Sequence, residues 1–187
     1  MRDAVNIKVA GFGGQGVMMF GQILAYSATK DNINGLWFPS YGPETRGGTA
    51  NCSVIVSEKQ INSPVFKNAN HLVIFNSPSL DKFRNNVAPE GLILYNSSLI
   101  SCEVTEEDRL CVGVPINDIA LELGNAKVAN MVMMGAYLQL TKLFSDETIH
   151  AIIKKILGER KADLLDVNFK ALEAGKDFIK KQGIVYA

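Results

Sequence analysis

A stretch of 21 residues without a single charge, residues 9–29, most limits the folds open to this chain. A stretch of this length is long enough to cross a membrane as a helix. Its five glycines would break such a helix and leave backbone amides unpaired in lipid, whereas they suit a turn before a buried helix. We therefore expect a strand at 6–10, a glycine turn, a helix at 17–29, and no membrane span.

The rest of the chain alternates short apolar runs with segments of helical periodicity. We expect further strands at 36–38, 49–57, 71–75, 92–95 and 110–114, and further helices at 80–87, 117–123, 128–144, 146–157 and 163–181. Strands that alternate with helices predict an α/β fold, here a three-layer, Rossmann-like α/β/α arrangement around a mostly parallel sheet. The sheet is mixed if the strand at 49–57 runs antiparallel to its neighbour.

Length, charge and cysteine content narrow the function. The 187 residues, 47% of them hydrophobic, suffice for one domain spanning 1–187 with a substantial core. The 19 Lys and Arg balance 19 Asp and Glu without a basic block, which argues against nucleic acid as a partner. Cys52, Cys102 and Cys111 are far apart and form no C-x-x-C pair. They predict neither a metal site nor a disulfide framework, and they fit a reducing cytoplasm.

The glycine turn at 11–16 is the first candidate binding site, because backbone amides at the start of a helix can hold a phosphate. A nicotinamide-binding fold also needs an acid at the end of its second strand, whereas Asp31 falls in the turn before that strand. A nucleoside-triphosphate loop needs Lys and then Ser or Thr where this chain has Val17 and Met18. Two interpretations remain open: an anion site, or a tight turn that only packs the helix on the strand.

The loop at 39–49 is the second candidate, because it places Glu44 and Arg46 among glycines, prolines and hydroxyl residues. Arg46 can present its planar fork to a carboxylate or phosphate while Glu44 holds it in place. The other interpretation is a surface ion pair on a turn.

Several polar residues are weaker candidates. Asn76 and Asn96 follow predicted strands, so we expect them at the carboxyl edge of the sheet, where open α/β folds bind ligands. His71 and His150 have no partner at metal-ligand spacing, and we expect neither to be a site residue. The helical segment 128–140 is apolar on every side, so another part of the chain or a partner subunit must cover it.

Four sequence motifs carry a family resemblance. The chain contains GFGGQGV at 11–17, ILAYSATK at 23–30, PSYGPETRGGTANCSVIVS at 39–57 and INSP at 61–64. Together they resemble the gamma subunit of 2-oxoacid:ferredoxin (acceptor) oxidoreductases, and the third motif is most similar to the 2-oxoglutarate branch. The resemblance covers nearly the whole chain.

The resemblance implies a multi-subunit enzyme that decarboxylates a 2-oxoacid on thiamine diphosphate and passes electrons through iron–sulfur clusters to ferredoxin or another acceptor. The acyl group is delivered to coenzyme A, which gives succinyl-CoA from 2-oxoglutarate. This chain has no Gly-Asp-Gly followed by paired Asn, the thiamine–magnesium signature, and no clustered cysteines. Thiamine diphosphate, magnesium and the clusters would therefore lie on alpha and beta subunits and on a ferredoxin-like delta subunit where one is present.

The same resemblance implies that this chain contributes to the coenzyme A site. The residues expected to bind coenzyme A are Gly11, Gly13, Gly14, Gln15, Gly16 and Arg46. Arg46 and Glu44 are also the candidates for a catalytic role. A non-catalytic nucleotide-binding regulator, and a gamma subunit of the pyruvate or another 2-oxoacid branch, remain as alternatives.

Overall fold

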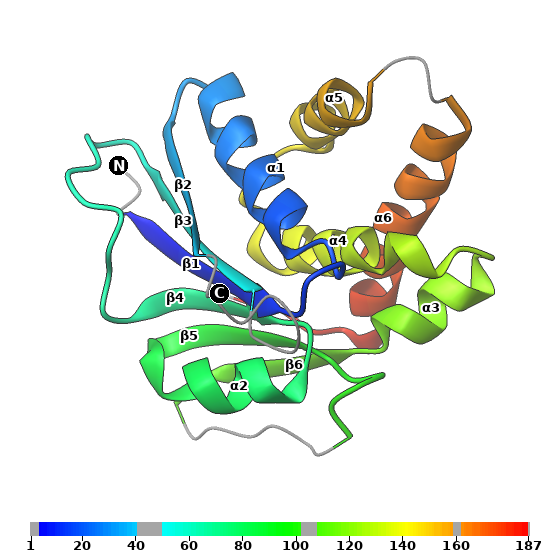
Figure 1. Cartoon of the computed structure of the whole chain (residues 1–187), viewed down its shortest axis with the longest axis horizontal. Coiled ribbons are helices and arrows are strands. Elements are labelled where there is room, and N and C mark those ends of the chain that lie inside the picture. The colour runs from blue at the N-terminus through cyan, green and yellow to red at the C-terminus, as the bar shows by residue number, and fades with distance from the viewer. Residues whose placement is uncertain (1–3, 41–49, 102–107, 159–161, 187) are drawn as a thin grey trace.

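The computed structural model describes residues 4–40, 50–101, 108–158 and 162–186, and its centre is a six-stranded sheet (Figure 1). The strands are β1 (Val5–Gly11), β2 (Asn34–Ser40), β3 (Ala50–Ser57), β4 (Ala69–Ile74), β5 (Val87–Asn96) and β6 (Leu110–Val114). Their order across the sheet is β2-β3-β1-β4-β5-β6. The pairs β1–β4, β4–β5 and β5–β6 are parallel, whereas β3 is antiparallel to both of its neighbours. The predicted α/β fold is confirmed, and the sheet is mixed.

Helices lie on both faces of the sheet, as the α/β/α prediction requires (Figure 1). They are α1 (Val17–Lys30), α2 (Ser77–Phe83), α3 (Ile116–Glu122), α4 (Ala129–Thr141), α5 (Asp146–Leu157) and α6 (Ala162–Gln182), with short 3-10 helices η1 (Arg84–Asn86) and η2 (Ala126–Val128). Because side chains alternate along a strand, Ile7 and Val9 of β1 join a large core with α1 and α4. Leu72 of β4 instead joins Leu80 of α2 in a smaller core. The two outer layers are therefore unequal.

Helix α4 is the apolar helix that the sequence left uncovered, and α6 of the same chain packs on it. The two backbones touch: a Cβ placed on Gly135 of α4 would overlap the carbonyl oxygen of Leu172 in α6. Reciprocally, a Cβ on Gly175 of α6 would overlap the carbonyl oxygen of Val132 in α4. No partner subunit is needed to cover this helix. Within the described ranges, no helix combines the length and hydropathy of a membrane span.

The helix expected at 80–87 is wrong in position. Helix α2 starts earlier because the Asn76 side chain caps it, accepting a hydrogen bond from the Ser79 N–H (3.0 Å), and because Pro78 sits in its first turn. Val87, which the prediction placed in the helix, begins β5 instead. Helix α4 is also shorter than the predicted 128–144, since Lys142 takes a left-handed conformation with φ 50° and ends it.

Candidate functional site

The glycine turn joins β1 to α1, and two of its residues have a backbone that favours glycine. Gly14 has φ +91° and Gly16 has φ +79°. Gly16 also caps α1, because its carbonyl accepts the Phe20 N–H at 2.9 Å. A Cβ at Gly16 would overlap the Asn130 side chain of α4. The fold itself therefore requires glycine at position 16.

Gln15 fixes the turn to the end of β4. Its Oε1 accepts hydrogen bonds from the Phe12 N–H (2.7 Å) and from Asn76 Nδ2 (3.2 Å). Its Nε2 donates to the Phe75 carbonyl at 3.4 Å. A Cβ at Gly11 would lie 2.7 Å from Gln15 Oε1 and 2.8 Å from Phe75 Cβ, so this glycine allows the close approach. Gln15 and Gly11 thus hold the shape of the turn.

Gly13 and Gly14 form the open half of the turn. Both are exposed, and a Cβ on either would meet no atom within 4 Å. The backbone at these two positions is therefore accessible to a ligand. This is the arrangement by which a turn before a helix binds an anion.

A small pocket of about 110 Å³ lies beside the open half of the turn. Its lining residues come from the turn, the end of β4, the start of α3, η2 and the start of α4: Gly14, Gln15, Phe75, Ile116, Asn117, Ala126, Lys127, Ala129 and Asn130. Lys127 supplies a positive charge here, and Asn117 and Asn130 supply amides. None of these three residues is among the site residues predicted from the sequence. The sequence does contain one indication of an ordered turn before α4: Asn125, whose side chain accepts a hydrogen bond from the Lys127 N–H (3.0 Å) and caps η2.

The second-tier candidates Asn76 and Asn96 lie at the carboxyl edge of the sheet, as expected. Asn96 is fully buried and its Nδ2 donates to the carbonyl of Phe75 (3.2 Å) and to Asn117 Oδ1 (2.9 Å). Asn76 caps α2 and donates to Gln15. Their amides are used within the chain, and they join the ends of β4, β5 and the glycine turn into one rigid edge.

The predicted site residues Glu44 and Arg46 lie outside the described residues. The strand ends that flank their segment are placed, because Ser40 of β2 pairs with Asn51 and Ala50 of β3 pairs with Gly11. The flanking residues Ser40 and Ala50 therefore lie at the edge of the sheet where the glycine turn begins.

Asp31, the acid considered for a nicotinamide site, is used elsewhere. It ends α1, with its N–H donating to the Ser27 carbonyl at 3.0 Å. Its carboxylate accepts a hydrogen bond from Thr148 Oγ1 of α5 at 2.6 Å. The residue joins two helices, which agrees with the interpretation that it is not a ribose ligand.

The two histidines lie apart from the turn. His71 is buried in β4, where its Nδ1 and the Tyr137 hydroxyl form a hydrogen bond of 2.8 Å, and burial lowers its pKa to about 4. His150 packs on the Phe169 ring, with ring centroids 4.4 Å apart. Among the described residues, no group of three or more His, Cys, Asp or Glu side chains is arranged to hold a metal ion.

Comparison with known proteins gives the family. The sequence profile of the family described as pyruvate ferredoxin/flavodoxin oxidoreductase matches residues 6–178. Ketoisovalerate oxidoreductase subunit VorA of Methanothermobacter marburgensis is 38% identical over 177 residues, which are 95% of this chain but 37% of that protein. The chain thus spans little more than a third of that relative's length. 2-Oxoglutarate synthase subunit KorC of Methanocaldococcus jannaschii is 32% identical over 179 residues and 94% of each chain.

A solved structure has the same fold. The gamma subunit of a keto/oxoacid ferredoxin oxidoreductase from Geobacter sulfurreducens PCA superposes with a TM-score of 0.78 at 27% identity. The match covers 92% of this chain and 96% of that one. With the profile match over 6–178, these relationships show that the chain belongs to the pyruvate ferredoxin/flavodoxin oxidoreductase family.

Proposed function

We propose that this chain is the gamma subunit of a 2-oxoacid:ferredoxin oxidoreductase, folds as one domain and acts in the cytoplasm. The observation that carries the proposal is the family match over 6–178, together with the end-to-end similarity to a solved gamma subunit. The exposed backbone of Gly13 and Gly14 and the neighbouring Lys127 add an anion site at the edge of the sheet. The complete enzyme oxidatively decarboxylates a 2-oxoacid to an acyl-CoA.

The work of this enzyme is divided among subunits. The chain has three cysteines, whereas an iron–sulfur cluster takes four cysteine ligands, and it lacks the thiamine–magnesium signature. Alpha and beta subunits therefore hold thiamine diphosphate and magnesium, and clusters on other subunits pass electrons to ferredoxin or another acceptor. The gamma subunit contributes to assembly and to binding of coenzyme A.

2-Oxoglutarate is the proposed substrate. The motif at 39–57 resembles the 2-oxoglutarate branch, and the 2-oxoglutarate synthase subunit matches over 94% of both chains. A branched-chain 2-oxoacid is the second candidate, because the ketoisovalerate oxidoreductase subunit is more similar at 38% identity.

Coenzyme A is proposed to place a phosphate on the open half of the glycine turn. There the backbone at Gly13 and Gly14 is accessible and the Lys127 ammonium supplies positive charge, so the residues present fit an anionic group. Gly11, Gln15 and Gly16 keep the turn in shape. Arg46 would hold a second anionic group, and Glu44 would orient it.

Produced alone, the chain should be colourless, bind no thiamine diphosphate and turn over no 2-oxoacid.

Tagged in the cells that make it naturally, it should co-purify in a fixed ratio with subunits that carry thiamine diphosphate and iron–sulfur clusters. That complex should reduce ferredoxin fastest with 2-oxoglutarate when 2-oxoglutarate, 2-oxoisovalerate and pyruvate are compared. Cluster absorption or turnover by the pure chain would contradict the division of labour. Recovery of the chain without partners would favour the nucleotide-binding regulator.

Replacing Gly13 by valine should raise the KM of the assembled enzyme for coenzyme A about tenfold or more, because the side chain fills the space above the exposed amides. The KM for the 2-oxoacid should stay unchanged, and so should the melting temperature, because a Cβ at this position meets no protein atom within 4 Å. Gly16→Val is a poorer test, since it would also collide with Asn130. A folded Gly13→Val enzyme with a normal KM for coenzyme A would make the turn purely structural.

A further inference from the structure

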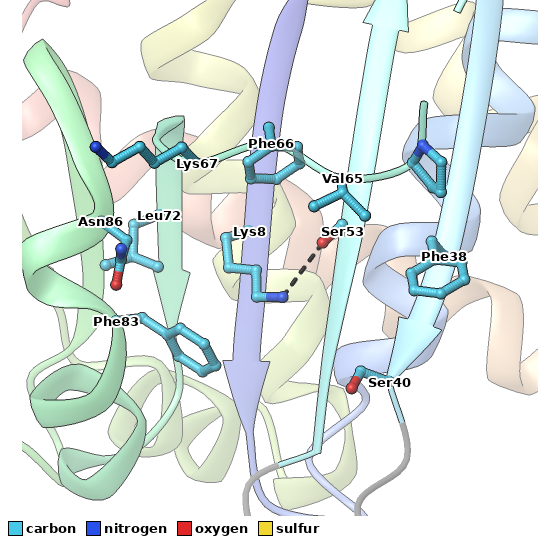
Figure 2. A pocket seen from close by; sticks show the side chains of 11 residues that line it. Lys8, Phe38, Ser40, Ser53, Val65, Phe66, Lys67, Leu72, Phe83 and Asn86 are labelled. Atoms are coloured by element: carbon cyan, nitrogen blue, oxygen red, sulfur yellow. Dashed lines mark hydrogen bonds between the residues drawn. The ribbon is translucent and has the colours of Figure 1, made fainter. Parts of the chain in front are cut away.

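A lysine lies in the middle of the sheet, on the face that carries α2. Phe38 of β2, Ser53 of β3, Lys8 of β1 and Leu72 of β4 are paired residue to residue across four strands, so their side chains share one face. Leu72 is covered by the small core around α2. In Figure 2, the space above Lys8 has Phe83 and Asn86 on one side and Phe38 of β2 on the other.

This space is a pocket of about 310 Å³. The sheet forms its floor, the segment 64–67 crosses one end, and Phe83 and Asn86 close the side toward α2 (Figure 2). Apolar groups dominate the lining, and the described residues that form it include no Asp or Glu. The volume and the mostly apolar lining with a few polar groups are typical of a small-molecule site.

Among the described residues, Lys8 has no acidic partner in this pocket. Its Nζ donates to Ser53 Oγ at 3.2 Å and lies 5.1 Å from the centroid of the Phe83 ring. Across the ranges that the structure describes, no carboxylate lies within ion-pair distance of it. Burial lowers the pKa of Lys8, and the nearby charge of Lys82 lowers it further. A half-buried ammonium in such surroundings gains from a bound anion.

We propose that this pocket binds a small organic anion, with its carboxylate or phosphate at Lys8 Nζ and its apolar or aromatic body between Phe38 and Phe83. The hydroxyl of Ser53 is within reach of the same anionic group, since it already contacts Lys8. Phe66 covers the body from the segment above the sheet (Figure 2). The exposed cation Lys67 at the rim adds attraction for a negative charge.

The pocket is separate from the proposed coenzyme A site. Among the residues that the structure describes, it shares no lining residue with the pocket beside the glycine turn. The inference does not rest on the proposed function, because it uses only the geometry and charge of the sheet face.

The probe for this site is 3-phenylpropanoate, and its neutral match is 3-phenylpropanamide. Titration of the ¹⁵N-labelled full chain should shift backbone amides around Ser53, Phe66 and Leu72. The amide compound should bind the same protein at least about tenfold more weakly, because it lacks the charge. Lys8→Met should weaken binding of the acid by a similar factor, and Lys181→Met, an exposed lysine on α6, should leave it unchanged.

Several outcomes would overturn the proposal. One is equal affinity of the wild-type chain for the acid and the amide, a comparison that needs no variant to fold. Equal binding of the acid to folded Lys8→Met would remove the assigned anchor, and shifts confined to other surfaces would place the probe elsewhere. Binding that occurs in the free chain but disappears in the purified complex would assign the pocket to a side chain of a partner subunit instead.

Discussion

Replacing Gly175 by alanine should lower the free energy of unfolding by about 3 kcal/mol, the upper end of the range for overpacking. The added methyl would overlap the Val132 carbonyl oxygen and lie 2.9 Å from the Ala136 nitrogen. Both are backbone atoms of a buried helix, so no side chain can rotate away. The expected loss exceeds the gain of about 1 kcal/mol that alanine brings to a helix interior. Urea unfolding of the pure chain measures the difference.

Gly13→Ala is the matched control, because a Cβ there meets nothing within 4 Å, and its effect should stay within about 0.5 kcal/mol. Gly135→Ala should behave like Gly175→Ala, since its methyl would overlap the Leu172 carbonyl oxygen from the other helix. If both helix variants kept wild-type stability, α4 and α6 would not be in direct backbone contact.

The free energy of unfolding should fall by roughly 3 kcal/mol as the pH drops from 7 to 4, through His71 alone. This ring is 6% exposed, and burial lowers its pKa from 6.5 to about 4. Between these values the unfolded chain binds a proton at this position and the folded chain does not. The contribution of His71 to the free energy of unfolding is therefore complete above pH 6.5 and is lost as the pH falls toward 4. Urea titrations at a series of pH values measure the slope.

Two variants isolate this contribution. Tyr137→Phe removes the hydroxyl that contacts His71 Nδ1 but keeps the buried ring, so the pH dependence should persist. The double variant His71→Phe, Tyr137→Phe removes the titrating group without leaving an unpaired hydroxyl. The slope of the free energy of unfolding against pH between 4 and 6.5 should therefore decrease by the amount that corresponds to one bound proton. An unchanged slope in the double variant would show that His71 is protonated in the folded chain.

The elements with a clear periodicity and a clear cap could be predicted from the sequence. The strand Leu110–Val114 and the helix Asp146–Leu157 were predicted to the residue. The latter starts where the Ser145 hydroxyl accepts the Thr148 N–H at 3.2 Å, a local signal that any reader of the sequence can use. Helix α2 was misplaced because its Asn76 cap was interpreted only as a site residue.

The candidate site was predicted less completely, because its parts are distant in the sequence. The glycine turn was found from its own motif, but the demand for glycine at position 16 comes from Asn130, more than a hundred residues away. Lys127 was missed for the same reason, since only the fold brings η2 beside the turn. Lys8 lies within an otherwise apolar strand, and only the folded sheet brings it to Ser53 and Phe83.

The outermost position of β2 has a consequence for how this protein meets others. A free strand edge is a template for pairing with a strand of another chain, which is a common route to aggregation. Pro39 lies in β2, in register with Cys52 of β3, and proline has no N–H to donate to an added strand. A continuous ladder cannot be built across it. Pro39 therefore disfavours extension of the sheet by a strand of another chain at this edge.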